Sequence, residues 1–196
     1  MSVCTIHLIR HAEHGLLGRT LAGRTPGVGL SDTGRAQAAA LASHYRDLPI
    51  RAVLASPLQR AQETADPIAR ALTIPVVVTP ALDEVDFGRW AGMEFDGLAK
   101  APGWSAWNAT RSLAPTPGGE LMVSAQARAV TALMQLRLQG GCVVAVSHSD
   151  VIKAVLAYIL GMPLDLLHRL DIAPAGRSIL VLGEDFARVE GVNLPV

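Results

Sequence analysis

Runs of apolar residues alternate with segments of mixed character along most of the chain. Short runs rich in Val, Ile and Leu predict buried strands at 3–10, 51–56, 75–78 and 142–148. Longer segments with apolar residues at helical spacing predict helices at about 32–45, 57–72, 119–138 and 150–161. We expect residues 80–118 to be irregular with short helices, and the tail from Arg177 to form two or three strands.

This alternation predicts an α/β fold, a three-layer sandwich in which helices cover both faces of a mostly parallel central sheet. The run at 142–147 is almost uniformly apolar, as expected for a strand that is covered on both faces. No linker, low-complexity tract or long repeat interrupts the pattern. We therefore expect residues 1–196 to form a single domain.

Charged residues are few, so their positions are informative. They make up 17% of the 196 residues, below the usual level of about a quarter. Because 17 basic residues balance 17 acidic ones, a nucleic acid or membrane surface held by bulk charge is not expected as a partner. Neither a signal peptide nor an apolar stretch of ~18 residues is found, and the two cysteines form no disulfide or metal motif. These features predict a cytoplasmic protein.

The charged and polar residues gather where the predicted strands end. Ligands of open α/β sheets bind beyond the carboxyl ends of the strands, so side chains at these positions should converge on one rim. The residues at the strand ends or in the segments that follow them are Arg10, His11, Ser56, Arg60, Asp83, Glu84, Asp86, His148 and Ser149.

Two histidines, two arginines and a carboxylate on one rim suit phosphoryl transfer to histidine. A neutral imidazole is a good nucleophile near pH 7, because its unperturbed pKa is about 6.5. Arginine offers phosphate oxygens a planar fork of donors, and a carboxyl group can protonate the leaving alkoxide. Each of these residues, taken singly, is more often structural. Their joint placement is what favours a phosphoryl-transfer site.

Several motifs in order resemble those of the histidine phosphatase superfamily, the phosphoglycerate mutase-like proteins. "LIRHAEH" resembles the family's RHG signature, "ASPLQRAQETADPIA" its second-arginine motif and "LDEVDFGRWAGMEF" its acid loop. "GVGLSDTGRAQAAALA", "PGGE" and "VSHSDVIKAVLAYILGMPLD" are similar to further elements in the right order. The resemblance covers about residues 5–168, and it is strongest to a bacterial branch described as phosphomutase or phosphatase.

The resemblance implies a role for each matching position. His11 would be the phosphorylated nucleophile, and Glu84 the general acid that then activates water, with Asp83 and Asp86 as the other carboxylates of that loop. The positive charge that holds the phosphoryl group would come from Arg10, Arg60 and a protonated His148. The implied contacts to the rest of the substrate are Ala22, Gly23, Arg24 and Ser149. No metal or cofactor is expected.

Three departures from the family pattern bear on rate and substrate choice. Ala12 replaces the usual Gly after the nucleophile, and Ala resists a positive φ. The stretch "GLLGRT" lacks an Asn that often binds phosphate, so one contact would be lost. Ser149 replaces a Gly, and its hydroxyl either binds phosphate or caps the following helix.

The sequence leaves open which reaction the protein catalyses, and whether it is an enzyme. We favour a phosphomonoester hydrolase acting on a small phosphorylated metabolite, because the related mutases are longer and cover their site. A phosphomutase of the same fold and a non-catalytic binder of phosphorylated ligands are the other hypotheses. A zinc site at His11, His14 and His148 is discounted, since the spacing is not that of a helical zinc pair. An exposed face of "VLAYILGMPLDLL" would allow a homodimer, although a core helix is the default.

Overall fold

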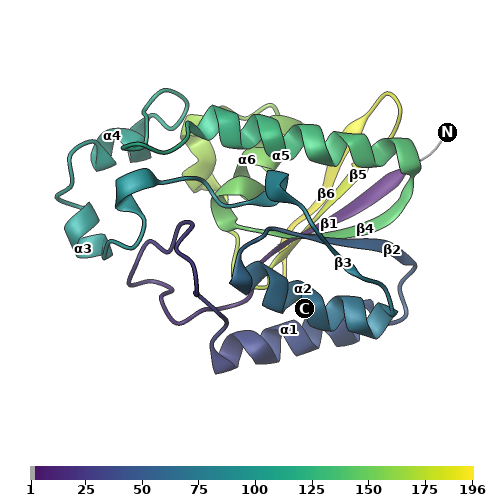
Figure 1. Ribbon diagram of the computed structural model, residues 1–196. Coiled ribbons are helices and arrows are strands. Elements are labelled where there is room, and N and C mark those ends of the chain that lie inside the picture. The colour runs from purple at the N-terminus through teal and green to yellow at the C-terminus, as the bar shows by residue number, and fades with distance from the viewer. Residues whose placement is uncertain (1–2) are drawn as a thin grey trace.

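The computed structural model describes residues 3–196, in which six strands form one sheet with the order β3-β2-β4-β1-β5-β6 (Figure 1). The central strand β1 is parallel to β4 and antiparallel to β5. The strands β2, β3 and β4 are parallel to one another, and β6 is antiparallel to β5. Their bounds are β1 Cys4–Arg10, β2 Ile50–Ala55, β3 Val76–Val78, β4 Gly141–Ser147, β5 Arg177–Leu182 and β6 Ala187–Leu194.

Helices cover both faces of this sheet, which confirms the predicted three-layer α/β sandwich. In Figure 1, α1 and α2 lie below the sheet and α5 and α6 lie above it. The short helices α3 and α4 lie to one side, beyond the ends of the strands. The bounds are α1 Asp32–Tyr45, α2 Gln59–Leu72, α3 Phe95–Leu98, α4 Trp104–Ala109, α5 Met122–Leu136 and α6 Ser149–Ile159. Single-turn 3₁₀ helices lie at Pro80–Leu82, Gly88–Trp90 and Arg137–Gln139, and a longer one lies at Leu164–Arg169.

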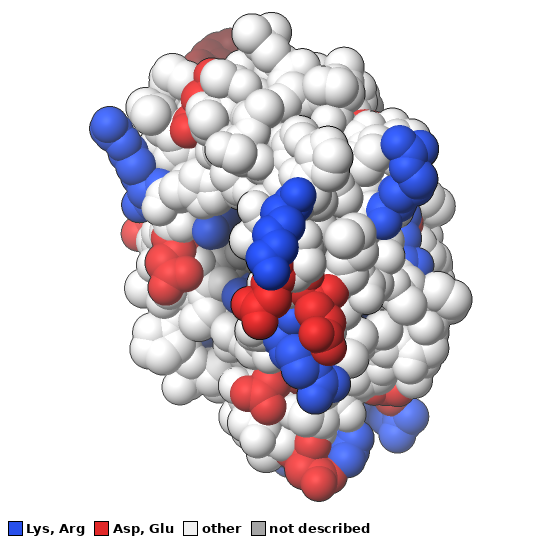
Figure 2. Space-filling model, turned by 90° about the vertical axis from the view of Figure 1, so that its left-hand side faces the viewer, with Lys and Arg blue, Asp and Glu red and all other residues white. Residues whose placement is uncertain are grey.

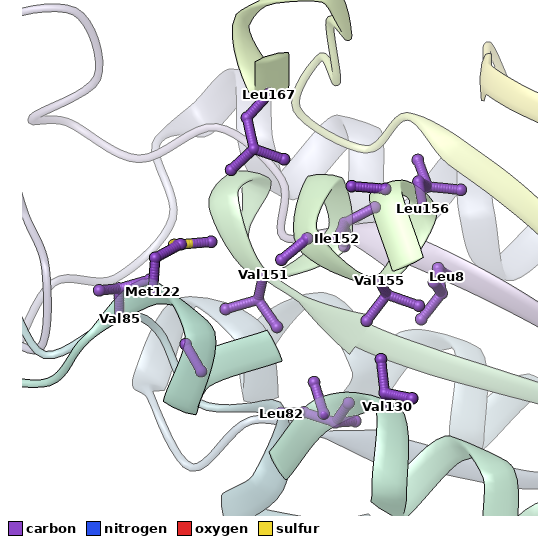
Figure 3. Packing of buried hydrophobic residues seen from close by; sticks show 14 of the residues in the cluster. Leu8, Leu82, Val85, Met122, Val130, Val151, Ile152, Val155, Leu156 and Leu167 are labelled. Carbon is purple, nitrogen blue, oxygen red and sulfur yellow. The ribbon is translucent and has the colours of Figure 1, made fainter. Parts of the chain in front are cut away.

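The two faces of the central strands explain why their sequences are apolar at nearly every position. Successive side chains of a strand point to opposite faces. Leu8 therefore packs with the residues of α5 and α6, as Figure 3 shows, whereas Ile9 packs in the core cluster on the side of α1 and α2. In β4, Val143 and Val144 divide between the two clusters in the same way. The burial on both faces makes the sheet a rigid support for the loops at its ends.

Two helices begin at least two residues later than predicted. The helix predicted from residue 119 begins at Met122, because Gly119 lies so close to the carbonyl of Asp86 that a Cβ there would be 2.0 Å from its oxygen. The helix predicted from Pro57 begins at Gln59, because Ser56 accepts a hydrogen bond from the Leu58 amide and turns the chain. The described tail after 176 forms two strands, in agreement with the prediction of two or three.

The predicted first helix does begin as expected. Ser31 is its N-cap, and its Oγ accepts a hydrogen bond from the Gly34 amide at 3.1 Å.

In the segment 155–167, the apolar residues are mostly buried in the core, whereas Tyr158 and Leu160 are exposed. Within the described chain, no helix combines the length and apolar character needed to cross a membrane.

Candidate active site

A pocket of about 300 Å³ lies at the carboxyl ends of β1 and β4. Figure 2 shows this end of the molecule, with blue basic side chains in and around a hollow and red acidic ones beside them. The predicted site residues that line the pocket are Arg10, His11, Ala22, Gly23, Arg60, Glu84 and Ser149. His148 lies behind this lining, fully buried, with its ring centroid 5.1 Å from that of His11.

His11 is held in one orientation and one tautomer. Its amide donates to the Ser147 carbonyl of β4 at 2.8 Å, and its Nδ1 lies 2.8 Å from the Ala12 carbonyl oxygen. A carbonyl oxygen only accepts, so Nδ1 carries the proton and Nε2 keeps its lone pair. Burial, followed by the charge of Arg60, lowers the pKa of His11 well below its usual value. The ring is therefore neutral, with a nucleophilic nitrogen.

Ala12 fits the backbone without strain. Of the described residues other than glycine, those with positive φ are Thr73, Ala175 and Asn193, so position 12 does not need a glycine conformation. The Ala12 side chain is buried, and its amide donates to Oγ1 of Thr64 at 2.9 Å. The replacement of glycine therefore leaves the loop after His11 undistorted.

Arg60 lies in the interior although its side chain is charged. It is 1% exposed, and its Nη2 donates to the Gly23 carbonyl at 2.7 Å and to Nδ1 of His148 at 3.2 Å. Its Nε and Nη1 are buried without a partner among the described residues. Arg10 is similar, because its Nη1 donates to the Ile172 carbonyl at 2.6 Å while its buried Nε is unpaired in the described chain. Buried donors without partners are costly, so both guanidinium groups are suited to an anion.

His148 is neutral in the ligand-free protein, contrary to the expectation that it carries positive charge. Burial, followed by the charges of His11 and Arg60, lowers the pKa of His148 well below its usual value. Because Arg60 only donates, Nδ1 of His148 is an acceptor, and Nε2 donates to Oγ of Ser56 at 2.8 Å. Within residues 3–196, no three His, Cys, Asp or Glu side chains are arranged to hold a metal ion.

Glu84 is the carboxyl group of its loop that enters the pocket. Burial, followed by the charge of Asp150, raises the pKa of Glu84 to about 7. Asp83 and Asp86 point elsewhere: Asp83 accepts from Ser56 and from the Glu84 amide, and Asp86 accepts from the Gly88 amide. A carboxyl group that titrates near 7 can both give and take a proton at physiological pH.

Arg24 does not contact the pocket, which corrects its predicted role. Its Nε donates to the Glu84 carbonyl at 2.8 Å and its Nη2 to Oε1 of Glu120 at 2.8 Å. Arg128 donates to the same carbonyl and the same carboxylate, at 3.0 and 2.7 Å. Arg24 is absent from the described pocket lining. It therefore positions the loop of Glu84, together with Arg128 and the Glu120 of "PGGE".

Ser149 lines the pocket, whereas the N-cap of α6 is His148. The alternative that Ser149 caps this helix is therefore wrong. The lining also includes residues outside the predicted site, among them Asp150 and Arg111, whose Nη1 donates to Asp150 at 2.6 Å. An acidic residue in the first turn of a helix is common, so the sequence offered no signal that Asp150 acts on Glu84. His14, adjacent to the RH motif, also lines the pocket.

Comparison with known proteins agrees with this fold. Residues 6–195 match the model of the histidine phosphatase superfamily (branch 1), and the chain belongs to this family. An uncharacterised Mycobacterium tuberculosis protein, Rv0525, is 41% identical over 165 residues, which are 80% of this chain and 78% of that protein. The adenosylcobalamin/alpha-ribazole phosphatase of Escherichia coli is 28% identical over 192 residues, covering 95% and 94% of the two chains.

Solved structures of the same fold include a phosphatase. The mycobacterial glucosyl-3-phosphoglycerate phosphatase Rv2419c superposes with a TM-score of 0.87 and 27% identity, covering 98% of this chain and 99% of that one. One sequence relative is named as a mutase: the probable phosphoglycerate mutase GpmB of an Enterobacter species. It is 32% identical over an alignment that covers 81% of this chain and 75% of that protein.

Proposed function

We propose that the protein is a phosphomonoester hydrolase that acts on a small phosphorylated metabolite through a phosphohistidine intermediate at His11. The observation that carries this proposal is the pairing of a neutral, nucleophilic Nε2 of His11 with buried, unpartnered guanidinium donors of Arg10 and Arg60. The similarity to phosphatases supports hydrolysis, and the similarity to GpmB makes a phosphomutase the second candidate.

The reaction proceeds in two steps. In the first, Nε2 of His11 attacks phosphorus, the bond from phosphorus to the ester oxygen breaks, and Glu84 protonates the leaving alkoxide. In the second, Glu84 takes a proton from water, whose oxygen attacks the phosphohistidine and releases phosphate. Arg10 and Arg60 stabilise the phosphoryl oxygens in both steps. His148 orients Arg60, because its Nδ1 accepts a hydrogen bond from Nη2 of Arg60.

The remainder of the substrate lies against Ala22, Gly23 and Ser149 in this proposal. The pocket lining also includes Phe87, Phe95, Trp104, Lys153 and His168. We also propose that residues 1–196 act as one domain, because one sheet joins the first and last strands. The free thiols of Cys4 and Cys142 support a cytoplasmic location.

The test is an assay of purified protein against p-nitrophenyl phosphate and a panel of phosphorylated metabolites, in excess EDTA. We expect release of inorganic phosphate at an unchanged rate after EDTA treatment, because arginines supply the positive charge. Transfer of phosphate within a substrate without release would identify a mutase, and tight binding without turnover would identify a binder. Activity lost in EDTA and restored by zinc or magnesium would contradict the histidine mechanism.

Asp150→Asn should shift the pH dependence of the first step. Glu84 must be protonated to act as an acid, so kcat/KM falls as pH rises through its pKa of about 7. The charge of Asp150 raises that pKa, and its removal leaves Arg111 uncompensated, so both effects lower it. We expect the descending limb of the pH profile to move to lower pH, by about one unit. Asp66→Asn, at a half-exposed position on α2, is the control and should leave the limb in place.

A further inference from the structure

His14 is a buried pocket residue to which the mechanism above gives no role. It is 5% exposed, it lines the pocket, and its ring centroid lies 5.2 Å from that of His11. We propose that His14 binds the phosphoryl group directly, by donating a hydrogen bond from Nε2–H to one of its oxygens. This inference rests on the proposed phosphoryl site.

The loop after His14 determines which ring nitrogen is protonated. The Leu16 amide donates to Nδ1 of His14 at 3.2 Å. An amide nitrogen only donates, so Nδ1 keeps its lone pair and the neutral ring carries its proton on Nε2. The same turn is closed by a second hydrogen bond, from the Leu17 amide to the His14 carbonyl at 3.0 Å, and the backbone of His14 is bridged to Leu30. The ring is thereby held with Nε2 as the nitrogen available to the pocket.

The two neighbouring histidines are thus set to opposite tautomers by the backbone groups beside them. A carbonyl, that of Ala12, places the proton of His11 on Nδ1 and leaves Nε2 as a nucleophile. An amide, that of Leu16, leaves His14 with a proton on Nε2 and makes that atom a donor. A nucleophile and a donor side by side are what a group with an electrophilic phosphorus and anionic oxygens requires.

The electrostatic surroundings keep His14 in this form. Burial, followed by the charges of Arg60 and Arg10, lowers the pKa of His14 to about 4. The ring is therefore a neutral donor throughout the physiological range, and the positive charge of the site comes from the two arginines. Together with the unpartnered donors of Arg60 and Arg10, His14 adds a donor from the loop after β1, a different element from that of Arg60.

Two substitutions separate this role from that of holding the turn. In His14→Gln, the amide nitrogen can reach the position of Nε2 and still donate, but the acceptor for Leu16 is lost. In His14→Asn, the amide oxygen replaces Nδ1 and preserves the turn, but the donor is lost. Binding of inorganic phosphate is measured by calorimetry, so the result does not depend on whether the protein turns over any substrate. His44→Asn, which changes an exposed histidine of α1, is the control.

We expect His14→Asn to weaken phosphate binding at least about tenfold and His14→Gln to keep it within about threefold, as for the loss of one hydrogen bond to a charged group. The reverse order would show that His14 serves the turn alone. If either variant fails to fold, nitrogen-15 spectra of the wild type decide: the Nε2–H resonance of His14 should move downfield when phosphate is added. An unchanged resonance at saturating phosphate would overturn the proposal.

Discussion

His11→Ala should reduce kcat at least about a thousandfold, equivalent to about 4 kcal/mol of transition-state stabilisation. The variant loses the atom that forms the covalent bond to phosphorus, so no other group can provide the same two-step path. In the wild type, rapid quenching in alkali should trap an adduct of one phosphoryl group on the peptide that contains His11. A phosphohistidine is acid-labile and stable in alkali, unlike a phosphoserine ester, and mass spectrometry distinguishes the two.

Two further variants control this experiment. Glu84→Gln should accumulate the adduct on activated aryl phosphates, which leave without a proton, because water is no longer activated for the second step. His148→Ala should still form some adduct, since His148 acts on the oxygens through Arg60. An adduct mapped to His14, His148 or Ser149, with His11→Ala still active, would contradict the proposed mechanism.

Arg60→Ala should reduce kcat/KM about a hundredfold, or roughly 3 kcal/mol, because it removes buried donors from the developing charge of the phosphoryl group. The buried side chain is also bonded to Gly23 and His148, so thermal unfolding is measured in parallel to separate catalysis from stability. Steady-state kinetics on an aryl phosphate give the effect.

Arg70→Ala is the matched control for this change. Arg70 lies on the same helix, α2, but its side chain is 79% exposed and paired with Asp66. Exposed ion pairs contribute little, so this variant should keep wild-type kinetics. A decrease of less than fivefold in Arg60→Ala, with the folded state intact, would remove Arg60 from the site.

Much of the fold was predictable because the burial of strands and helices requires apolar residues at regular positions in the sequence. Strands covered on both faces are apolar at nearly every position, as in β4, and the covering helices have apolar residues at helical spacing. The errors lay at boundaries, such as the start of α5, where Gly119 packs against the carbonyl of Asp86. A contact between segments 33 residues apart leaves no local pattern.

The sequence by itself determined which chemistry gathers at the carboxyl edge of the sheet, because parallel strands end at the same edge and Arg10 and His11 end β1. Only the tertiary structure decided the state and direction of these groups. The Leu16 amide and the Ala12 carbonyl select opposite tautomers for two histidines, and Asp150 helps to raise the pKa of Glu84. Arg24, which a motif match assigned to the substrate, instead holds the Glu84 carbonyl. Protonation and orientation depend on desolvation, on the direction in which neighbouring backbone groups point and on partners elsewhere in the fold, and none of these can be obtained from residue spacing alone.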